Sequence, residues 1–231
     1  MFQHRKWWRC LLLGVLVVGL GWESLMLAEV LWWRTHDPSQ TAFMRARSES
    51  RQARGLPPLA PHPWVPYDRI PVALKRAVVA AEDSRFVQHD GFDWQGIRQA
   101  YDRDVQRHRL VAGGSTISQQ LAKNLFLSEH RTWWRKAQES ILTVMLESFW
   151  SKRRILEVYL NTIEWGDGEF GCAAASRHYF GVTVERLSPS EAARLASMIP
   201  RPRFYDRHGP TEQLLDKART IGLRMNQVSI P

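Results

Sequence analysis

Hydrophobic positions recur with helical spacing over most of the chain beyond residue 66. In "GGSTISQQLAKNLF", which runs from 113 to 126, Ile117, Leu121 and Leu125 fall on one face of a helix. The same spacing predicts helices over 71–83, 115–126, 135–149, 151–161, 169–180, 187–199 and 212–225. Alternating patterns typical of strands are scarce. The pattern therefore predicts a mostly α domain.

Two of these helices also carry recognisable start signals. Ser188 and Glu191 have the spacing of a capping box, and Pro189 between them suits the first helical position. Pro71 opens the first helix of the domain in the same way. These signals support the helical reading of the periodicity.

The N-terminal pattern is different, because apolar residues are nearly continuous from 10 to 33. That length is sufficient to span a bilayer, and Trp32 and Trp33 suit a membrane interface. Glu23 and Glu29 interrupt the run, so the apolar core proper is as short as 10–22, a length that also fits a signal peptide. No clear cleavage site follows, so we expect an uncleaved anchor at 10–33 after a cytoplasmic tail at 1–9.

The orientation of this anchor is not decided by its flanking charges. Basic residues stand on both sides of it, as Arg5, Lys6 and Arg9 before it and Arg34, Arg45, Arg47 and Arg51 after it. From 34 to 66 the composition becomes polar and then proline-rich, with no sustained period, which is typical of a linker. We therefore expect a linker at 34–66 and one folded domain at 67–231.

Charge and cysteine content narrow the function only partly. Thirty-two Lys and Arg against 23 Asp and Glu give a net charge of +9, which suits partners that carry phosphate, such as nucleic acid, anionic lipid or pyrophosphate. Cys10 and Cys172 are the two cysteines, so neither a disulfide framework nor a thiolate metal site is supported.

Glu82 is the first candidate for chemistry. It borders the apolar face of the 71–83 helix near its C-terminal end, where partial burial and the helix dipole both disfavour the charged carboxylate. A carboxyl whose pKa is raised in this way suits a general base or acid. The alternative is that Glu82 and Asp83 end a surface helix and pair with Arg85.

The polar face of the 115–126 helix is the second candidate. Thr116, Gln119, Gln120 and Lys123 lie within an arc of roughly 100°, just after two glycines. Backbone N–H groups at a helix start, carboxamides and a lysine can bind phosphate and sugar oxygens. An ordinary solvated face is the alternative, although such faces favour mixed Glu and Lys. The order of a nucleotide-binding phosphate loop is absent.

Two basic clusters follow. Arg135, Lys136 and Glu139 lie within about one helical turn, and the second cluster, Lys152 to Arg154, precedes another amphipathic helix. Salt-bridged surface helices have the same appearance. In the functional reading, some of these cations stabilise a pyrophosphate leaving group and Glu139 acts as a second carboxylate beside Glu82.

These segments together resemble a known family. "EDSRFVQHDG", "GGSTISQQLAKNLF", "RKAQES", "SKRRILEVYLN" and "FGCAAASRHYFG" are similar, in order and spacing, to the five motifs of the peptidoglycan glycosyltransferases. The resemblance extends from about residue 67 to the C-terminus. No S-x-x-K occurs in the chain, so we expect no transpeptidase activity. Val182 departs from the family pattern, where a lysine is frequent.

The resemblance implies a lysozyme-like α fold, one N-terminal transmembrane helix in the cytoplasmic (inner) membrane, and a catalytic domain outside it. It implies that lipid II and the lipid-linked glycan are the substrates, joined by β-1,4 linkages with inversion. Glu82 would be the base and Glu139 the second essential carboxylate. The implied substrate-binding residues are Asp83, Arg85, Phe86, His89, Gly91, Ser115, Thr116, Gln119, Gln120, Lys123, Asn124, Arg135, Lys136 and Lys152.

Cofactors and protein partners are less defined. A divalent cation such as Mg²⁺ could bridge the pyrophosphate, but no cluster of ligands requires one. Other proteins of wall synthesis or division are partners that the resemblance leaves unnamed. The polyprenyl tail calls for an apolar rim, for which Phe92, Trp94, Ile97 and Tyr101 are candidates, with burial in the core as the alternative.

Two other functions fit some of these features. A lysozyme-like hydrolase or lytic transglycosylase would also pair a Glu of raised pKa with a sugar groove, but it needs no basic pyrophosphate site. A membrane-tethered nucleic-acid binder would account for the charge of +9, although no recognised nucleic-acid module occurs. We therefore expect no nucleic-acid partner.

Overall fold

The computed structural model describes residues 3–59, 61–98, 114–129 and 132–231. It divides into two compact units, Met1–His36 and Asp37–Pro231, which are described separately. The first unit contains α1 (Gln3–Trp33), in which Leu11–Trp33 is long and apolar enough to cross a membrane. One N-terminal helix that could span a membrane agrees with the anchor expected from the sequence.

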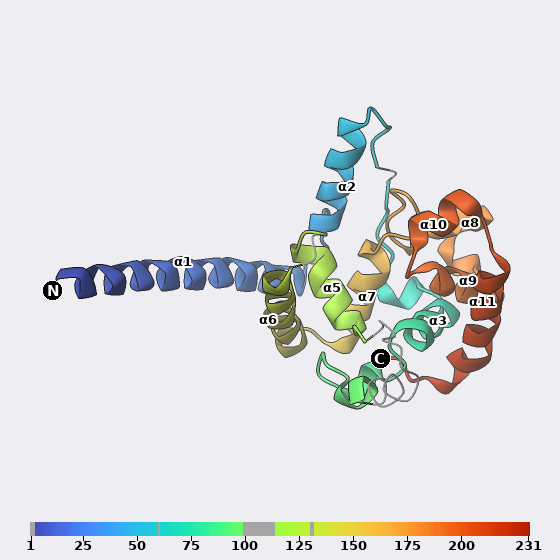
Figure 1. Ribbon diagram of the computed structural model, residues 1–231. Coiled ribbons are helices and arrows are strands. Elements are labelled where there is room, and N and C mark those ends of the chain that lie inside the picture. Colours follow the sequence, from blue (N-terminus) through green and yellow to red (C-terminus); the bar gives the residue numbers. More distant parts are fainter. Residues whose placement is uncertain (1–2, 60, 99–113, 130–131) are drawn as a thin grey trace. The chain divides into compact units, whose positions relative to one another are not determined.

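Within the described residues, the elements of the second unit are all helices, apart from one isolated bridge between Glu164 and Phe170 (Figure 1). Its helices are α2 (Ala42–Ala53), α3 (Val72–Glu82), α5 (Ile117–Phe126), α6 (Trp133–Phe149), α7 (Lys152–Thr162), α8 (Cys172–Phe180), α9 (Pro189–Met198), α10 (Pro202–His208) and α11 (Glu212–Arg224). Short 3₁₀ turns are Tyr67–Arg69, Phe86–Gln88, Val184–Arg186 and Met225–Gln227. The mostly α class predicted from the periodicity is confirmed.

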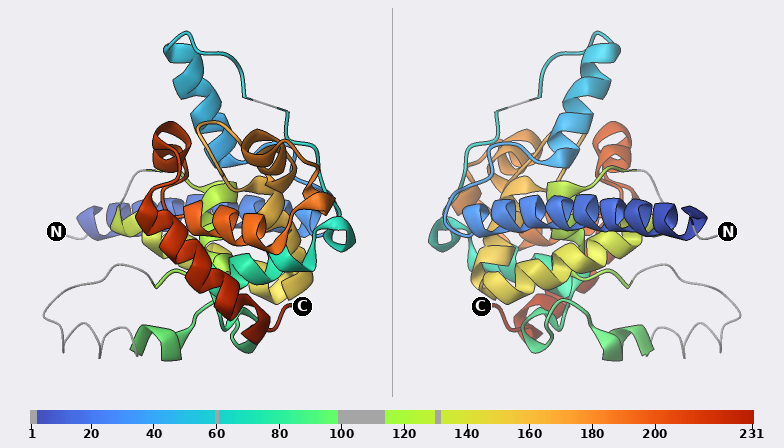
Figure 2. Two further views of the ribbon diagram at one scale, coloured as in Figure 1. Left: turned by 90° about the vertical axis from the view of Figure 1, so that its right-hand side faces the viewer. Right: turned by 90° about the vertical axis from the view of Figure 1, so that its left-hand side faces the viewer.

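The predicted apolar faces form the core of this unit. Ile117, Leu121 and Leu125 of α5 are fully buried, as the spacing predicts. Helix α5 packs against α6 and α7, while α9 packs between α3 and α11 (Figure 2). The capping box of Ser188 and Glu191 is formed at the start of α9. Two groups of packed helices therefore carry the segments that the sequence analysis selected.

Helix α2 departs from the sequence prediction. The 34–66 segment was expected to be a linker, yet residues 42–53 form a helix that packs on α5. Met44 and Arg47 are its buried residues. Because one of the two inward positions is an arginine, the stretch lacks the apolar period by which a helix is detected in a sequence. The folded unit therefore includes more of the chain than 67–231.

Candidate active site

Glu82 is the last residue of α3 and lies next to the polar face of α5. Its Oε2 accepts a 2.8 Å hydrogen bond from Nε2 of Gln120. Burial raises the pKa of the Glu82 carboxyl, and the hydrogen bond from Gln120 and the charges of Lys217 and Lys123 offset this only in part. The raised pKa expected from the sequence is therefore present in the fold.

Tyr159 of α7 fixes the other end of the Gln120 amide. Its hydroxyl donates a 2.8 Å hydrogen bond to Oε1 of Gln120, and the ring is fully buried. With the oxygen of the amide held by the tyrosine, the NH₂ group points to Glu82. Burial, followed by the charge of Glu82, raises the pKa of Tyr159 well above its ordinary value, so the phenol remains a proton donor. Sequence analysis did not select Tyr159, whose only signal is a hydroxyl on an otherwise apolar helix face.

A cleft of about 550 Å³ lies beside this pair of residues. Eight of the residues predicted from the sequence line it: Ser115, Gln119, Gln120, Lys123, Asn124, Arg135, Lys136 and Glu139. It is also lined by Phe43, Glu129, Tyr159, Ile163, Glu164, Ile199, Pro200, Pro202 and Arg203, none of which was predicted. The structure therefore brings the polar face of α5 and the basic start of α6 together around one cavity.

Glu139 is a buried carboxylate in the wall of this cleft. Only 3% of the residue is exposed, and its two oxygens accept hydrogen bonds from Arg135 at 3.0 Å and from Lys136 at 2.5 Å. The N-cap hydroxyl of Thr132 starts α6 and so sets the register that places all three on one turn. The predicted cluster is formed, with the carboxylate holding both cations at the edge of the cavity.

Lys123 lies across the cleft on α5. Its Nζ is 5.5 Å from the centre of the Phe43 ring of α2, within the range of a cation–π contact. Together with Arg135, Lys136 and Arg203, it gives the cavity four basic side chains against three carboxylates, those of Glu129, Glu139 and Glu164. Such a lining suits a ligand with phosphate groups.

Asp83 connects the end of α3 to the start of α5. One of its oxygens lies 2.9 Å from Nε2 of His89, and the other accepts a 3.1 Å hydrogen bond from the backbone N–H of Ile117. The Asp83 side chain is almost completely buried. A carboxylate at this position stabilises the N-terminus of α5. Asp83, the residue next to Glu82, therefore fastens the end of α3 to the start of α5, the helix that carries Gln120. His89 binds the other oxygen of the Asp83 carboxylate.

Thr116 and Gly91 form a second connection between the same segments. Thr116 is the N-cap of α5, and its hydroxyl donates a 2.7 Å hydrogen bond to the carbonyl of Gly91. Gly91 has φ of +88°, and a Cβ there would come within 2.7 Å of Thr143, so glycine is required. The sequence analysis placed the Thr116 hydroxyl on a face available to a ligand, whereas this hydroxyl is buried and serves the cap. A substrate contact by Thr116 stays a prediction.

The other eight predicted residues do not line the cleft: Glu82, Asp83, Arg85, Phe86, His89, Gly91, Thr116 and Lys152. Lys152 pairs with Glu147 at 2.7 Å, and its Nζ lies 4.6 Å from the centre of the buried Phe86 ring. Arg85 pairs with Asp93 at 3.6 Å. In this arrangement Lys152 and Phe86 support the packing around α6 and α7. Their predicted contact with substrate is not tested by these positions.

The sequence analysis left open a divalent cation that bridges the pyrophosphate and predicted no cluster of ligands for it. No group of three or more His, Cys, Asp or Glu side chains among the described residues could hold a metal ion.

The candidate apolar rim for the polyprenyl tail is only partly described, since Tyr101 lies outside the described residues. Trp94 is 71% exposed and stacks on Phe92, with 5.6 Å between the ring centres.

Comparison with known proteins identifies relatives along the whole chain. The transglycosylase family model matches residues 58–226. The biosynthetic peptidoglycan transglycosylase of Methylobacillus flagellatus is 52% identical over 224 residues, covering 97% of this chain and 97% of the relative. That of Aromatoleum aromaticum is 56% identical over 203 residues, covering 87% of each chain, and that of Nitrosospira multiformis is 47% identical over the full length of both.

Proposed function

Because the chain belongs to the transglycosylase family and is a peptidoglycan transglycosylase of cell wall synthesis, we propose that it polymerises lipid II into β-1,4-linked glycan. The growing lipid-linked glycan is the donor and a new lipid II is the acceptor. Polyprenyl pyrophosphate is the leaving group. No transpeptidase step belongs to this proposal.

One observation carries the proposal. A carboxyl whose pKa is raised, Glu82, is bound to Gln120 at the edge of a cleft that also contains Lys123, Arg135 and Lys136. A polymerase that expels pyrophosphate needs both a base and cations, whereas hydrolysis of a glycan needs no cationic site of this kind. The combination of the two therefore favours polymerisation over hydrolysis.

In the proposed reaction, Glu82 removes the proton from the 4-hydroxyl of the acceptor sugar. The acceptor oxygen attacks the anomeric carbon of the donor, a new C–O bond forms with inversion, and the bond to the pyrophosphate oxygen breaks. The proton stays on Glu82 until it is released to solvent. Because burial raises the pKa of Glu82, the carboxylate is a stronger base than an exposed glutamate.

The cations balance the charge that develops on the leaving group. Lys123 and the pair Arg135 and Lys136 lie on two helices that line the cleft, so pyrophosphate bound between them would meet positive charge from both. Glu139 holds Arg135 and Lys136 by direct hydrogen bonds and in this proposal is essential through that positioning. Gln119, Asn124 and Ser115 would bind sugar and phosphate oxygens.

We also propose that α1 is a single-pass anchor in the cytoplasmic membrane, with the catalytic unit on its outer side. Its length and composition support this. The lipid-linked substrate is presented from the same membrane. A divalent cation bound to the substrate pyrophosphate would supply further charge neutralisation, but none of the steps above depends on it.

Incubation of the purified full chain with lipid II in detergent tests the proposal. We expect products longer than one disaccharide, resolved by gel electrophoresis and degraded by a muramidase, and no such products from the Glu82→Gln variant. Failure to elongate lipid II, combined with shortening of preformed glycan, would show that the protein is a hydrolase instead.

A further inference from the structure

Helix α2, which lies before the 58–226 segment matched by the family model, takes part in the cleft. Phe43 of α2 lines the cavity, where its ring contacts Lys123. Arg47 lies one turn further along the same helix and is almost completely buried. Helix α2 therefore forms part of the wall of the cleft, although none of its residues takes part in the proposed reaction.

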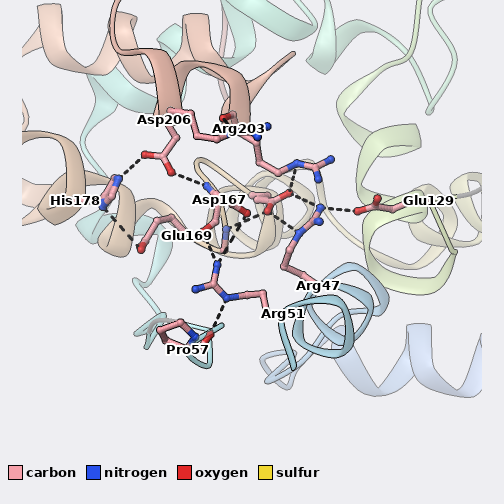
Figure 3. Close-up of polar contacts among 12 residues, drawn as sticks. Arg47, Arg51, Pro57, Glu129, Asp167, Glu169, His178, Arg203 and Asp206 are labelled. Carbon is pink, nitrogen blue, oxygen red and sulfur yellow. Dashed lines mark hydrogen bonds and ion pairs between the residues drawn. The ribbon is translucent and has the colours of Figure 1, made fainter. Parts of the chain in front are cut away.

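The Arg47 guanidinium binds two carboxylates that belong to the wall of the cleft (Figure 3). Its Nε lies 2.9 Å from Oε1 of Glu164, and its Nη2 donates to Oε2 of Glu164 at 3.1 Å. The same Nη2 donates to Oε1 of Glu129 at 2.8 Å. This fork connects the segment after α5, which contains Glu129, to the segment after α7, which contains Glu164.

Arg47 is the main group that stabilises the charged form of the Glu164 carboxylate. The carboxyl is buried, which raises its pKa, and Arg47 is the largest of the influences that lower it again. The other groups that face Glu164 are the N–H of Gly168 at 3.2 Å and Arg203 of α10 at 3.7 Å. Glu164 also contributes to the raised pKa of Tyr179 of α8.

A buried ion pair of this kind contributes little to stability compared with apolar residues of similar size, although loss of Arg47 alone would leave Glu164 buried without its cation. Its presence in the wall of a cleft therefore indicates a role in fixing positions. We propose that Arg47 is a positioning residue of the active site, which holds Glu129 and Glu164 in place so that α2 completes the wall of the cleft. This inference rests on the proposed function, because its main readout is the kinetics of lipid II polymerisation.

Arg51 on the same helix provides a matched control. Its Nε donates to the carbonyl of Pro57 at 2.8 Å and its Nη1 to the carbonyl of Asp167 at 3.1 Å, and none of these residues lines the cleft (Figure 3). Loss of Arg51 weakens the attachment of α2 without removing a charge partner from the wall. Arg47→Gln and Arg51→Gln, made in the full chain, therefore separate positioning of the wall from general support of α2.

We expect Arg47→Gln to raise KM for lipid II by at least about tenfold with a smaller change in kcat, and Arg51→Gln to leave both within about twofold of wild type. Arg47→Lys keeps a charge but loses the fork, so it retains the fold and raises KM by a smaller factor. If Arg47→Gln does not fold, the Arg47→Lys variant decides. Wild-type kinetics in Arg47→Lys, or equal defects in the Gln variants of Arg47 and Arg51, would overturn the inference.

A second readout does not depend on the substrate. Backbone hydrogen exchange at 127–129 should accelerate in Arg47→Gln and not in Arg51→Gln, because only Arg47 holds Glu129. If the wild-type protein fails to polymerise lipid II, the proposed function is wrong. The hydrogen-exchange measurement then tests by itself whether Arg47 holds Glu129 in place. Unchanged exchange at 127–129 in a folded Arg47 variant would contradict it.

Discussion

Gln120 joins Tyr159 to Glu82 by two hydrogen bonds of equal length, 2.8 Å on each side of one carboxamide. The chain of contacts runs from α7 through α5 to the end of α3. Since the tyrosine hydroxyl occupies the amide oxygen, the orientation of the amide is determined and its NH₂ group remains directed at the carboxylate. The proposed base is therefore held by a group that itself has one allowed orientation.

The first prediction concerns Glu82. Glu82→Gln should abolish polymerisation while the protein still folds, because the amide preserves the shape of the side chain and cannot accept the proton. Residual activity within about tenfold of wild type corresponds to only about 1.4 kcal/mol of barrier, and would show that Glu82 is not the base. Initial rates with lipid II, measured on enzyme whose helicity matches wild type, give the answer.

The same substitution makes a prediction about stability. The folded-state pKa of Glu82 is raised, so ionisation of this group opposes folding at any pH above that pKa, and the opposition disappears as the pH falls toward the unfolded value. At neutral pH the Glu82→Gln variant should therefore be at least as stable as wild type, and the difference should shrink in acid. Denaturant unfolding at several pH values measures it. A variant that is much less stable at neutral pH would argue for a structural glutamate.

The second prediction concerns Tyr159. Tyr159→Phe removes the donor that fixes the orientation of the Gln120 amide, which weakens the hydrogen bond that lowers the pKa of Glu82. The acid limb of the pH–rate profile should move to higher pH, and the rate at neutral pH should fall about fivefold, as for the loss of one neutral hydrogen bond of about 1 kcal/mol.

Tyr67→Phe is the matched control, because the Tyr67 hydroxyl bonds the carbonyl of Pro231 and touches no cleft residue. It should leave the acid limb where it is in wild type. An acid limb that does not move in Tyr159→Phe, or that moves equally in both variants, would show that Tyr159 has no influence on the pKa of the base.

The third prediction separates two lysines that the sequence analysis grouped together. Lys123→Met should lower kcat by about 10²-fold or more, as for the loss of one charge-stabilising donor, with little loss of stability. Lys152→Met should chiefly lower stability, because it leaves the buried Glu147 without its cation. Turnover and thermal unfolding of the two variants are compared directly. Full turnover in folded Lys123→Met would remove Lys123 from the pyrophosphate site.

The fourth prediction concerns the membrane. A chain that lacks residues 1–33 should fold, because the helices of Asp37–Pro231 bury one core, and it should still bind liposomes through the exposed Trp94 and its neighbour Phe92. Replacement of both by serine should weaken co-sedimentation. Trp133 and Trp134 of α6, exposed by 93% and 76%, form a second candidate patch, and their serine double variant is the comparison. Equal binding by wild type and the Phe92 and Trp94 variant would exclude the predicted rim.

Helices with an apolar stripe could be predicted from the sequence, because burial of Ile117, Leu121 and Leu125 follows directly from their spacing. Glu82 and Glu139 were selected for a different reason, since each belongs to a segment that resembles a family motif, and their catalytic roles stay predictions. Helix α2 was missed because its inward position at Arg47 is charged, and a buried charge is explained only by carboxylates more than 80 residues away.

Predictions also differed from the structure for polar groups that can serve either a ligand or the fold. The Thr116 hydroxyl fits a ligand site and an N-cap equally well in sequence, and the carbonyl of Gly91 that binds it is known only from the fold. Lys152 matched a family motif, yet its partner Glu147 and the Phe86 ring place it outside the cleft. Spacing along a helix gives the face of a side chain and not the partner that it meets there.

The connections of Asp83 to Ile117 and of Gly91 to Thr116 have a consequence for how the protein tolerates changes in length. Both contacts lie outside residues 92–115, so they hold Asp83 and Gly91 against the start of α5 whatever the number of residues between them. A short Gly-Ser insertion between residues 99 and 113, away from Ser115 and from Phe92 and Trp94, should therefore leave turnover of lipid II near wild type, whereas the same insertion between 83 and 89 should abolish it. The contact between Glu82 and Gln120 is then independent of the length of chain that separates residues 92 and 115.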